Sequence, residues 1–284
     1  MVSDKTGPIQ AGPLSRMTMK DARVIVVLPA YNAARTLERT YADIPKDDVS
    51  RIILVDDVSQ DQTVEIARAL GLAVVIHVQN RGYGGNQKTC YLEALKDGAD
   101  VVVMLHPDHQ YDSKLVPALV RPILDRQADM VMGSRIMNGQ ALKGGMPLYK
   151  YVANRVLTIL ENIVYRTHLT DCHSGFRAYS HRLLTTVPFL LNSDDFVFDS
   201  QMIAQAVHFG FKIREIAVQA RYFPEASSVN FRVSTKYGIK TLAVMLSFLL
   251  QRLGLMRPKI FNFTLAEVVS RHYHESIFKE NPTR

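Results

Sequence analysis

The sequence has few cysteines and no long apolar run, and both shortages exclude classes of protein. Only Cys90 and Cys172 of its 284 residues are cysteine, too few for the disulfide framework of a small secreted domain. The polar stretch 1–20 lacks the apolar core of a secretory signal. A membrane span takes about 20 apolar residues, and the longest uncharged apolar stretch of the C-terminal third is Thr241–Leu250. We therefore expect a protein of the reducing cytoplasm, with 241–250 in a core or interfacial helix.

The charge is distributed unevenly along the chain. Residues 1–200 hold 22 basic and 22 acidic residues, whereas residues 201–284 hold 12 basic and 5 acidic ones, which accounts for the whole net charge of +7. This basic third predicts an anionic partner, such as phosphate, a lipid headgroup or nucleic acid, with a solvated basic face as the alternative. The apolar content of 47% is ordinary for a globular protein with one large or two small domains.

Short apolar runs alternate with helical patterns over the first half of the chain. Continuous apolar runs of this kind are typical of parallel strands buried on both faces by helices. The pattern therefore predicts an α/β fold that binds ligands at the carboxyl ends of its strands. The expected strands are 24–28, 52–55, 73–78, 101–105, 130–132 and 212–218, and the expected helices are 36–41, 63–70, 87–96, 115–124, 147–165, 198–209 and 234–253.

Polar residues follow four of these strands. Asp56 and Asp57 can accept hydrogen bonds from a base N–H or a ribose hydroxyl. Asp108 can hold a divalent cation that bridges two phosphates, although a helix cap is the alternative. The first strand ends in Pro29–Asn32, without the glycine-rich turn of a dinucleotide fold.

Six segments together resemble the family 2 glycosyltransferases, and most closely their dolichol-phosphate mannosyltransferase-like (polyprenyl-phosphate glycosyltransferase) branch. Each motif alone is modest, but six in the same order are specific, and the resemblance covers about residues 22–255. The segments are Val24–Asn32, Ile53–Thr63, Asn80–Gly85, His106–Tyr111, Gly133–Arg135 and Ser174–Ser180.

The resemblance implies a GT-A fold, which is a Rossmann-like, mostly parallel mixed sheet with helices on both faces. It divides the domain into a nucleotide-sugar half, 22–135, and an acceptor half, 136–255. Residues 1–21 would then be a flexible extension, and 256–284 a partly helical tail.

The resemblance also implies the donor site. The Asp-x-Asp motif that holds Mg²⁺ or Mn²⁺ and the diphosphate is here His106-Pro107-Asp108, so Asp108 is the metal ligand carried over. Gln110 is a second candidate, and His106 can ligate Mn²⁺, which tolerates imidazole better than Mg²⁺ does. The residues implied to bind the nucleotide are Pro29, Tyr31, Asn32, Asp56, Asp57, Asn80, Gly82 and Lys88.

The catalytic residues depend on the acceptor. A hydroxyl acceptor needs a general base, and Asp199, eleven residues before Gly210, fits the position that the family uses. Asp195 caps the same helix or touches the sugar. An acceptor phosphate is already ionised and needs no base. Arg135, with Arg177 and Arg221, can neutralise the leaving diphosphate, or else pairs with carboxylates.

The basic third then has a role in acceptor binding. The residues implied to hold the acceptor or the diphosphate are Arg177, Arg221, Ser227, Ser228, Arg232 and Lys236. Lys236, Lys240 and 241–250 can dock on an anionic membrane surface. The alternative places Leu242, Val244, Leu246 and Leu249 in the core or a homodimer interface.

The sequence therefore predicts an inverting glycosyltransferase that moves a hexose from a GDP- or UDP-sugar to a lipid-linked acceptor, most simply polyprenyl or dolichyl phosphate. We expect it in the cytoplasm or at the cytoplasmic face of the membrane. Transfer to another lipid or glycan hydroxyl, with Asp199 as base, is the first alternative. An inactive sugar-nucleotide-binding protein and a nucleotidyltransferase are others. No nucleic acid is expected as a partner, because the basic third lacks interleaved aromatic residues and a recognised motif.

Overall fold

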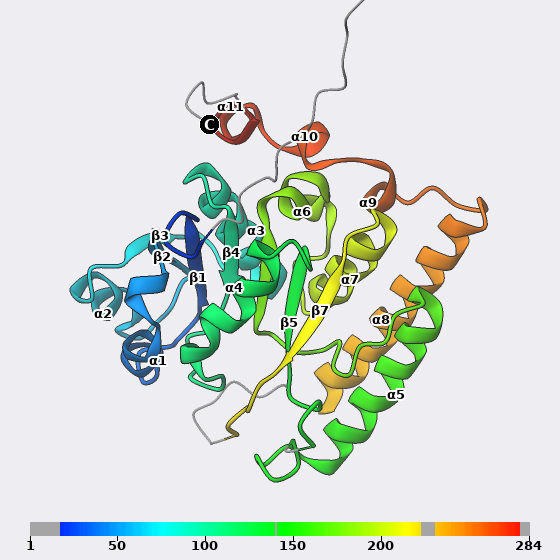
Figure 1. Ribbon diagram of the computed structural model, residues 1–284, viewed down its shortest axis with the longest axis horizontal. Helices are drawn as coiled ribbons and strands as arrows, with labels where there is room; N and C mark the ends of the chain where they lie inside the picture. Colours follow the sequence, from blue (N-terminus) through cyan, green and yellow to red (C-terminus); the bar gives the residue numbers. More distant parts are fainter. Residues whose placement is uncertain (1–17, 140, 223–230, 279–284) are drawn as a thin grey trace, which may run out of the picture.

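A seven-stranded mixed sheet forms the centre of the protein (Figure 1). The structure, a computed structural model, describes residues 18–139, 141–222 and 231–278. The strand order is β3-β2-β1-β4-β6-β5-β7. The strands are β1 Val24–Ala30, β2 Arg51–Asp56, β3 Ala73–Ile76, β4 Val101–Met104, β5 Met130–Ser134, β6 Arg177–Ser180 and β7 Ile213–Ala217.

Only β6 runs against its neighbours. It lies antiparallel between β4 and β5, whereas the other neighbouring strands pair in parallel. The predicted α/β fold with a mostly parallel mixed sheet is thus confirmed. The helices are α1 Leu37–Asp43, α2 Thr63–Ala69, α3 Gly82–Lys96, α4 Val116–Leu124, α5 Leu148–Tyr165, α6 His181–Thr186, α7 Phe198–His208, α8 Phe231–Arg252, α9 Lys259–Asn262, α10 Leu265–Val268 and α11 Arg271–Phe278.

Two hydrophobic cores lie on the two faces of the sheet. Successive side chains of a strand point to opposite faces, so Ile25 and Val27 of β1 enter one core and Val26 and Leu28 enter the other. Residues of α3, α6, α7 and α8 contribute to the first core, and residues of α1, α2 and α4 to the second. Because both faces are covered, the strands need the continuous apolar runs seen in the sequence.

Helix α3 begins five residues before the predicted start at Gln87. The carboxylate of Asp57 accepts hydrogen bonds from the backbone N–H groups of Arg81 and Gly82, so it satisfies donors that the first turn leaves without partners. The sequence pattern missed this turn because Gly84 and Gly85 are weak helix formers. A carboxylate from a distant loop supplies what local propensity lacks.

Helices α5 and α8 lie next to each other on the side of the molecule away from β1–β3 (Figure 1). On α8, Val244, Met245 and Phe248 enter the first core, whereas Leu242 and Leu246 are exposed. The core-packing alternative therefore holds for Val244 but not for the two leucines. Among the described residues, α8 is the one helix long and apolar enough to cross a membrane by length and composition. The sequence analysis predicted this helix at 234–253, close to its observed bounds, and expected it to be a core or interfacial helix.

Three short helices lie in the predicted C-terminal tail and pack on the domain. Phe261 of α9, Leu265 of α10 and Ile277 of α11 are buried in the first core. The hydroxyl of Tyr273 donates a hydrogen bond to Glu93 of α3. In Figure 1, α10 and α11 lie at the end of the sheet opposite the carboxyl ends of its parallel strands. Most of the predicted N-terminal extension lies outside the described residues.

The tail should contribute to the stability of the domain. Leu265 is 0% exposed and Leu255 is 69% exposed, so the same leucine-to-alanine change has different costs at the two positions. We expect Leu265→Ala to lower the free energy of unfolding by about 2–5 kcal/mol and Leu255→Ala to change it by about 0.5 kcal/mol or less. Urea unfolding measures both. Equal effects would contradict the packing of the tail on the domain.

Candidate active site

The carboxyl ends of β1, β2 and β4 meet at one edge of the sheet. Ala30 pairs with Asp56 and Val27 with Met104, so the loops after these strands lie close together. Because β6 is antiparallel and Arg177 pairs with Met104, the segment before β6 reaches the same edge. The structure therefore brings together the loops that carry most of the predicted nucleotide and metal residues.

The two adjacent acids after β2 have different partners. Asp57 accepts hydrogen bonds from Arg81 N, Gly82 N and Nδ1 of His77, at 2.8, 3.0 and 2.7 Å. Asp56 is only 1% exposed, and its Oδ2 accepts one hydrogen bond from Ser59 N. Its Oδ1 is buried and has no partner among the described residues. A buried acceptor without a partner is costly, so this oxygen is poised to accept a hydrogen bond from a ligand.

The loops after β1 and β2 bind each other. Asn32 donates its N–H to Oγ of Ser59, and its Oδ1 accepts the N–H of Gln60, both at 2.8 Å. Val58, the residue before Ser59, has a φ of 66°, a strained conformation for a β-branched residue. Tyr31 is exposed beside this junction, and Pro29 is buried within β1. Asn32 thus shapes the predicted nucleotide site by joining its two loops.

The remaining predicted nucleotide residues hold α3 in place. Asn80 donates to the backbone oxygen of Asp57. Lys88 is buried, donates to the backbone oxygen of Asn192 and forms an ion pair of 2.7 Å with Asp194. Gly82 has a φ of 76°, and a Cβ there would lie 2.7 Å from the backbone oxygen of Asp194. Gly82 and Lys88 therefore have a structural role, because both allow α3 to pack on the 192–194 loop.

The predicted metal motif follows β4. Oδ1 of Asp108 accepts the N–H of Gln110 at 3.1 Å, and burial raises the pKa of Asp108 despite the nearby His106. The described residues assemble no group of three or more His, Cys, Asp or Glu side chains. One carboxylate, one imidazole and one amide still suit Mg²⁺ or Mn²⁺ when phosphates and water complete the coordination. The residues present therefore fit a cation bound together with a diphosphate.

Asp199 is held by three side chains. Its Oδ2 accepts a hydrogen bond from the hydroxyl of Tyr83 at 2.8 Å, and its Oδ1 accepts one from Nε2 of Gln87 at 3.3 Å. The guanidinium of Arg177 lies 3.6 Å from Oδ2. Asp199 is only 6% exposed. Sequence reasoning assigned no role to Tyr83, although it lies inside the Asn80–Gly85 segment that carries the resemblance.

Arg177 lies inside the protein, beneath this edge. It is 0% exposed, and its three guanidinium nitrogens donate to the backbone oxygens of Ser174, Asp199 and Cys172 at 2.7–3.1 Å. Burial opposes the charge of Arg177, but the Asp199 carboxylate keeps its pKa well above the usual value. Arg177 therefore pairs with a carboxylate, which was the alternative to binding the diphosphate. Its side chain has no exposed surface in the described structure with which to contact a ligand.

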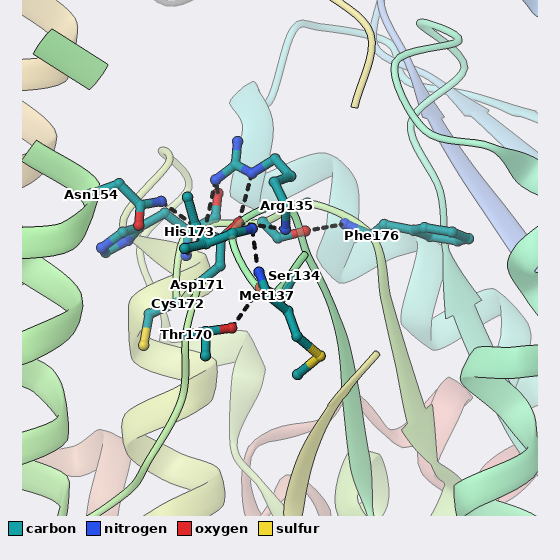
Figure 2. Close-up of polar contacts among 12 residues, drawn as sticks. Ser134, Arg135, Met137, Asn154, Thr170, Asp171, Cys172, His173 and Phe176 are labelled. Atoms are coloured by element: carbon teal, nitrogen blue, oxygen red, sulfur yellow. Dashed lines mark hydrogen bonds and ion pairs between the residues drawn. The ribbon is translucent and has the colours of Figure 1, made fainter. Parts of the chain in front are cut away.

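Arg135, after β5, forms a second buried ion pair (Figure 2). Its Nε and one terminal nitrogen lie 2.7 and 2.9 Å from the two carboxylate oxygens of Asp171, and it also donates to the backbone oxygen of His173. Asn154 of α5 donates to the same carboxylate. Although burial alone would raise it, the pKa of Asp171 is held well below its usual range by Arg135. The other terminal nitrogen of Arg135 makes only a long contact of 3.4 Å with Tyr222.

The other predicted residues lie on the surface or outside the described part. Oδ1 of Asp195 accepts the N–H of Val197, the residue before α7, and its Oδ2 pairs with Lys240 of α8. Arg221 is exposed and contacts His109. Lys236 is exposed on α8. Ser227, Ser228 and the side chain of Arg232 lie outside the described residues.

The comparison with known families identifies the class of protein to which this fold belongs, the glycosyltransferases. The family model for glycosyl transferase family 2 matches residues 25–187, and the chain belongs to this family. The family predicted from the six motifs is thus confirmed.

Two archaeal relatives match most of the chain. An uncharacterised protein of Methanocaldococcus jannaschii is 32% identical over 222 residues, which are 78% of this chain and 91% of that protein. A UDP-N-acetylglucosamine–dolichyl-phosphate N-acetylglucosaminyltransferase of Methanococcus voltae is 27% identical over 77% of this chain and 94% of its own.

Solved structures of one enzyme share the fold. Glucosyl-3-phosphoglycerate synthase from Mycobacterium tuberculosis, in complex with Mn²⁺, UDP and phosphoglyceric acid, has a TM-score of 0.61 at 20% identity and covers 81% of this chain and 82% of its own. Another crystal structure of that enzyme contains Mg²⁺ and UDP. This likeness shows the GT-A fold that the sequence predicted.

A buried acid lies beside the Arg135 cluster. Oε2 of Glu161, on α5, lies 3.3 Å from Nε2 of His173. Burial raises the pKa of Glu161 to about 8 and lowers the pKa of His173 to about 4. Both side chains are therefore uncharged at pH 7.

The stability of the protein should fall between pH 6.5 and 8 because of Glu161. In this window the unfolded carboxyl is ionised and the folded one is protonated, so the folded state binds one proton more and loses about 1–2 kcal/mol as the pH rises. His173 opposes this loss by less than about 0.5 kcal/mol, because its unfolded imidazole is half protonated at pH 6.5 whereas the folded one is neutral. Urea unfolding at pH 6.5 and 8 should show this loss in the wild type and a smaller one in Glu161→Gln. Equal losses would contradict the raised pKa.

Proposed function

We propose that this glycosyltransferase moves a hexose, with inversion, from a nucleotide diphosphate sugar to a lipid-linked phosphate. The observation that carries the choice of acceptor is the environment of Asp199. Both of its carboxylate oxygens accept hydrogen bonds from protein side chains, and it is 6% exposed. Its oxygens are aimed at Tyr83 and Gln87 inside the protein, so Asp199 is poorly placed to take a proton from an acceptor hydroxyl. An acceptor phosphate needs no such step, because it is already ionised at pH 7.

The chemistry then requires one displacement. A phosphate oxygen of the acceptor forms a bond to the anomeric carbon, while the bond from that carbon to the nucleoside diphosphate breaks, and no proton has to move. A divalent cation held by Asp108, with His106 and Gln110, would neutralise the charge that develops on the diphosphate. Arg135 lies at the same sheet edge, but its charge is already paired with Asp171, so the cation carries this neutralisation. The relative that acts on dolichyl phosphate supports the acceptor class.

The nucleotide would bind at the loops after β1 and β2. The unpartnered Oδ1 of Asp56 can accept the ring N–H of uracil or guanine, and the exposed Tyr31 offers a face for stacking. Asn32, Asp57 and Asn80 would fix the loops around them. Thermal shifts with UDP and GDP identify the base.

We also propose that the enzyme works as a peripheral protein at the cytoplasmic face of the membrane. Helices α5 and α8 each carry an exposed apolar stripe with residues spaced three and four apart. We call these stripes the apolar face. It consists of Leu148, Val152, Val156, Ile159, Leu160 and Ile163 on α5, Ile239, Leu242, Leu246 and Leu249 on α8, and Leu253 directly after α8.

The charges beside the apolar face select its partner. Among its described side chains, helix α8 has Lys236, Lys240 and Arg252, of which Lys240 pairs with Asp195. Its sequence has no acidic residue, and the single acid of α5 is the buried Glu161. A homodimer formed through this face would bring like charges together. An anionic lipid surface would bury the leucines and attract the basic residues, with about 1 kcal/mol of binding free energy for each Lys or Arg near the surface.

Polyprenyl phosphate should be a far better acceptor than the corresponding polyprenol. Without a free base, we expect the alcohol to react more slowly by about 10²–10⁴-fold, measured as radiolabelled sugar transferred with the donor that stabilises the protein. Asp108→Ala should abolish both reactions, because the diphosphate loses its cation. Equal rates with the alcohol would favour the hydroxyl-acceptor alternative.

Membrane binding should depend on the apolar face and on salt. We expect Ile163→Glu with Leu246→Glu to weaken co-sedimentation with anionic vesicles by about tenfold or more. Raising the salt concentration should weaken the wild type by screening. The matched control is Val78→Glu, which places the same acid on an exposed residue beyond β3. Vesicle binding that is unaffected by the double variant and by salt would overturn the membrane assignment. So would light scattering that shows a wild-type dimer and a monomeric double variant.

A further inference from the structure

Three side chains connect the metal motif to α7. Nε2 of His106 lies 3.1 Å from the hydroxyl oxygen of Tyr83, and that hydroxyl donates to Oδ2 of Asp199 at 2.8 Å. The rings of Tyr83 and His106 stack with their centroids 5.3 Å apart. His106 stands where the family motif has its first acid, so this chain of contacts ends at a position expected to face the cation.

The count of protons fixes the state of the imidazole. The hydroxyl of Tyr83 has one hydrogen and donates it to Asp199, so its oxygen can only accept from Nε2 of His106. Nε2 therefore carries the ring proton. A neutral imidazole with its proton on Nε2 has its lone pair on Nδ1.

The ring is also fixed in place. A Cβ at Gly175 would lie 2.9 Å from Cδ2 and 3.1 Å from Nε2 of His106, so the backbone before β6 closes on one side of the ring. Tyr83 lies against it from α3. Nδ1 has no hydrogen-bond partner among the described residues and is not one of their buried unpartnered atoms. It is therefore open to a ligand.

We propose that Tyr83 and Asp199 are positioning residues that hold His106 as the tautomer whose Nδ1 binds the divalent cation. The inference rests on the proposed function, because the cation belongs to the donor site. Metal-bound histidines generally donate their other ring N–H to a partner that fixes the tautomer, and Tyr83 is that partner here. A nitrogen ligand in place of a carboxylate favours Mn²⁺ over Mg²⁺. Asp199 then serves the donor site and not the acceptor.

The first test measures Mn²⁺ binding in the presence of UDP or GDP, whichever raises the melting temperature more. Calorimetry gives the affinity, and pulsed electron paramagnetic resonance detects a nitrogen bound to Mn²⁺. We expect a nitrogen coupling in the wild type and its loss in His106→Asp. A coupling that remained in this variant would come from His109. Tyr83→Phe should weaken Mn²⁺ binding by about 10–100-fold. Tyr165→Phe is the matched control, because it removes a buried hydroxyl that has no partner among the described residues.

Asp199→Asn separates positioning from other roles. Its Oδ1 can still accept from Gln87, so its amide faces Tyr83 and donates to the tyrosine oxygen. The hydroxyl of Tyr83 has then lost its acceptor at position 199 and donates instead to Nε2 of His106, which moves the ring proton to Nδ1. We expect the nitrogen coupling to disappear although the side chain keeps its shape. A purely structural Asp199 would leave the coupling unchanged.

The outcomes separate this inference from the proposed function. Mn²⁺ binding with the nucleotide but without a nitrogen coupling in the wild type overturns the role of His106 and leaves the glycosyltransferase proposal intact. An unchanged affinity in Tyr83→Phe, or an unchanged coupling in Asp199→Asn, overturns the positioning role. A wild type that binds no Mn²⁺ with either nucleotide overturns both this inference and the cation of the proposed function.

Discussion

The ion pair between Arg177 and Asp199 is the constraint on which the site depends. A fully buried guanidinium is costly unless its charge and all its N–H groups have partners. Here Asp199 supplies the charge, and three backbone oxygens supply the acceptors. The pair fixes the start of β6 against the start of α7. It also fixes the carboxylate that receives the hydrogen bond from Tyr83, and so connects α7 to the predicted metal motif after β4.

The same principle operates at the two other buried acids of the edge. The carboxylate of Asp57 accepts hydrogen bonds from the first turn of α3 and from His77. The carboxylate of Asp171 accepts hydrogen bonds from Arg135 and Asn154. Of the two adjacent acids after β2, Asp56 is the one that keeps a buried oxygen without a partner among the described residues. The site thus has a rigid frame of satisfied charges, in which the unsatisfied atoms are the ones that can meet a substrate. This division supports a donor site built by preorganised groups.

The sequence predicted the fold well and the individual roles less well. Strands and helices followed from local apolar periods, since each is set by residues close together in the chain. The motif Asp56-Asp57 pointed to the right loop, yet it does not reveal that one acid caps α3 while its neighbour is left open. That difference depends on Arg81 and Gly82, more than twenty residues away. Lys88 and Arg177 were assigned to ligands for the same reason, because charge is visible in a sequence and burial is not.

By itself, the sequence determined the family, the alternation of strands and helices and the order of the polar loops at the sheet edge, because all of these are local patterns. Only the tertiary structure decided which charged side chains are internal supports and which face a ligand. It tied Asp199 to Tyr83, Gln87 and Arg177, and it placed apolar stripes of α5 and α8 on the surface. The physical reason is that hydrogen-bond partners and burial are set by residues far apart in the chain that folding brings together.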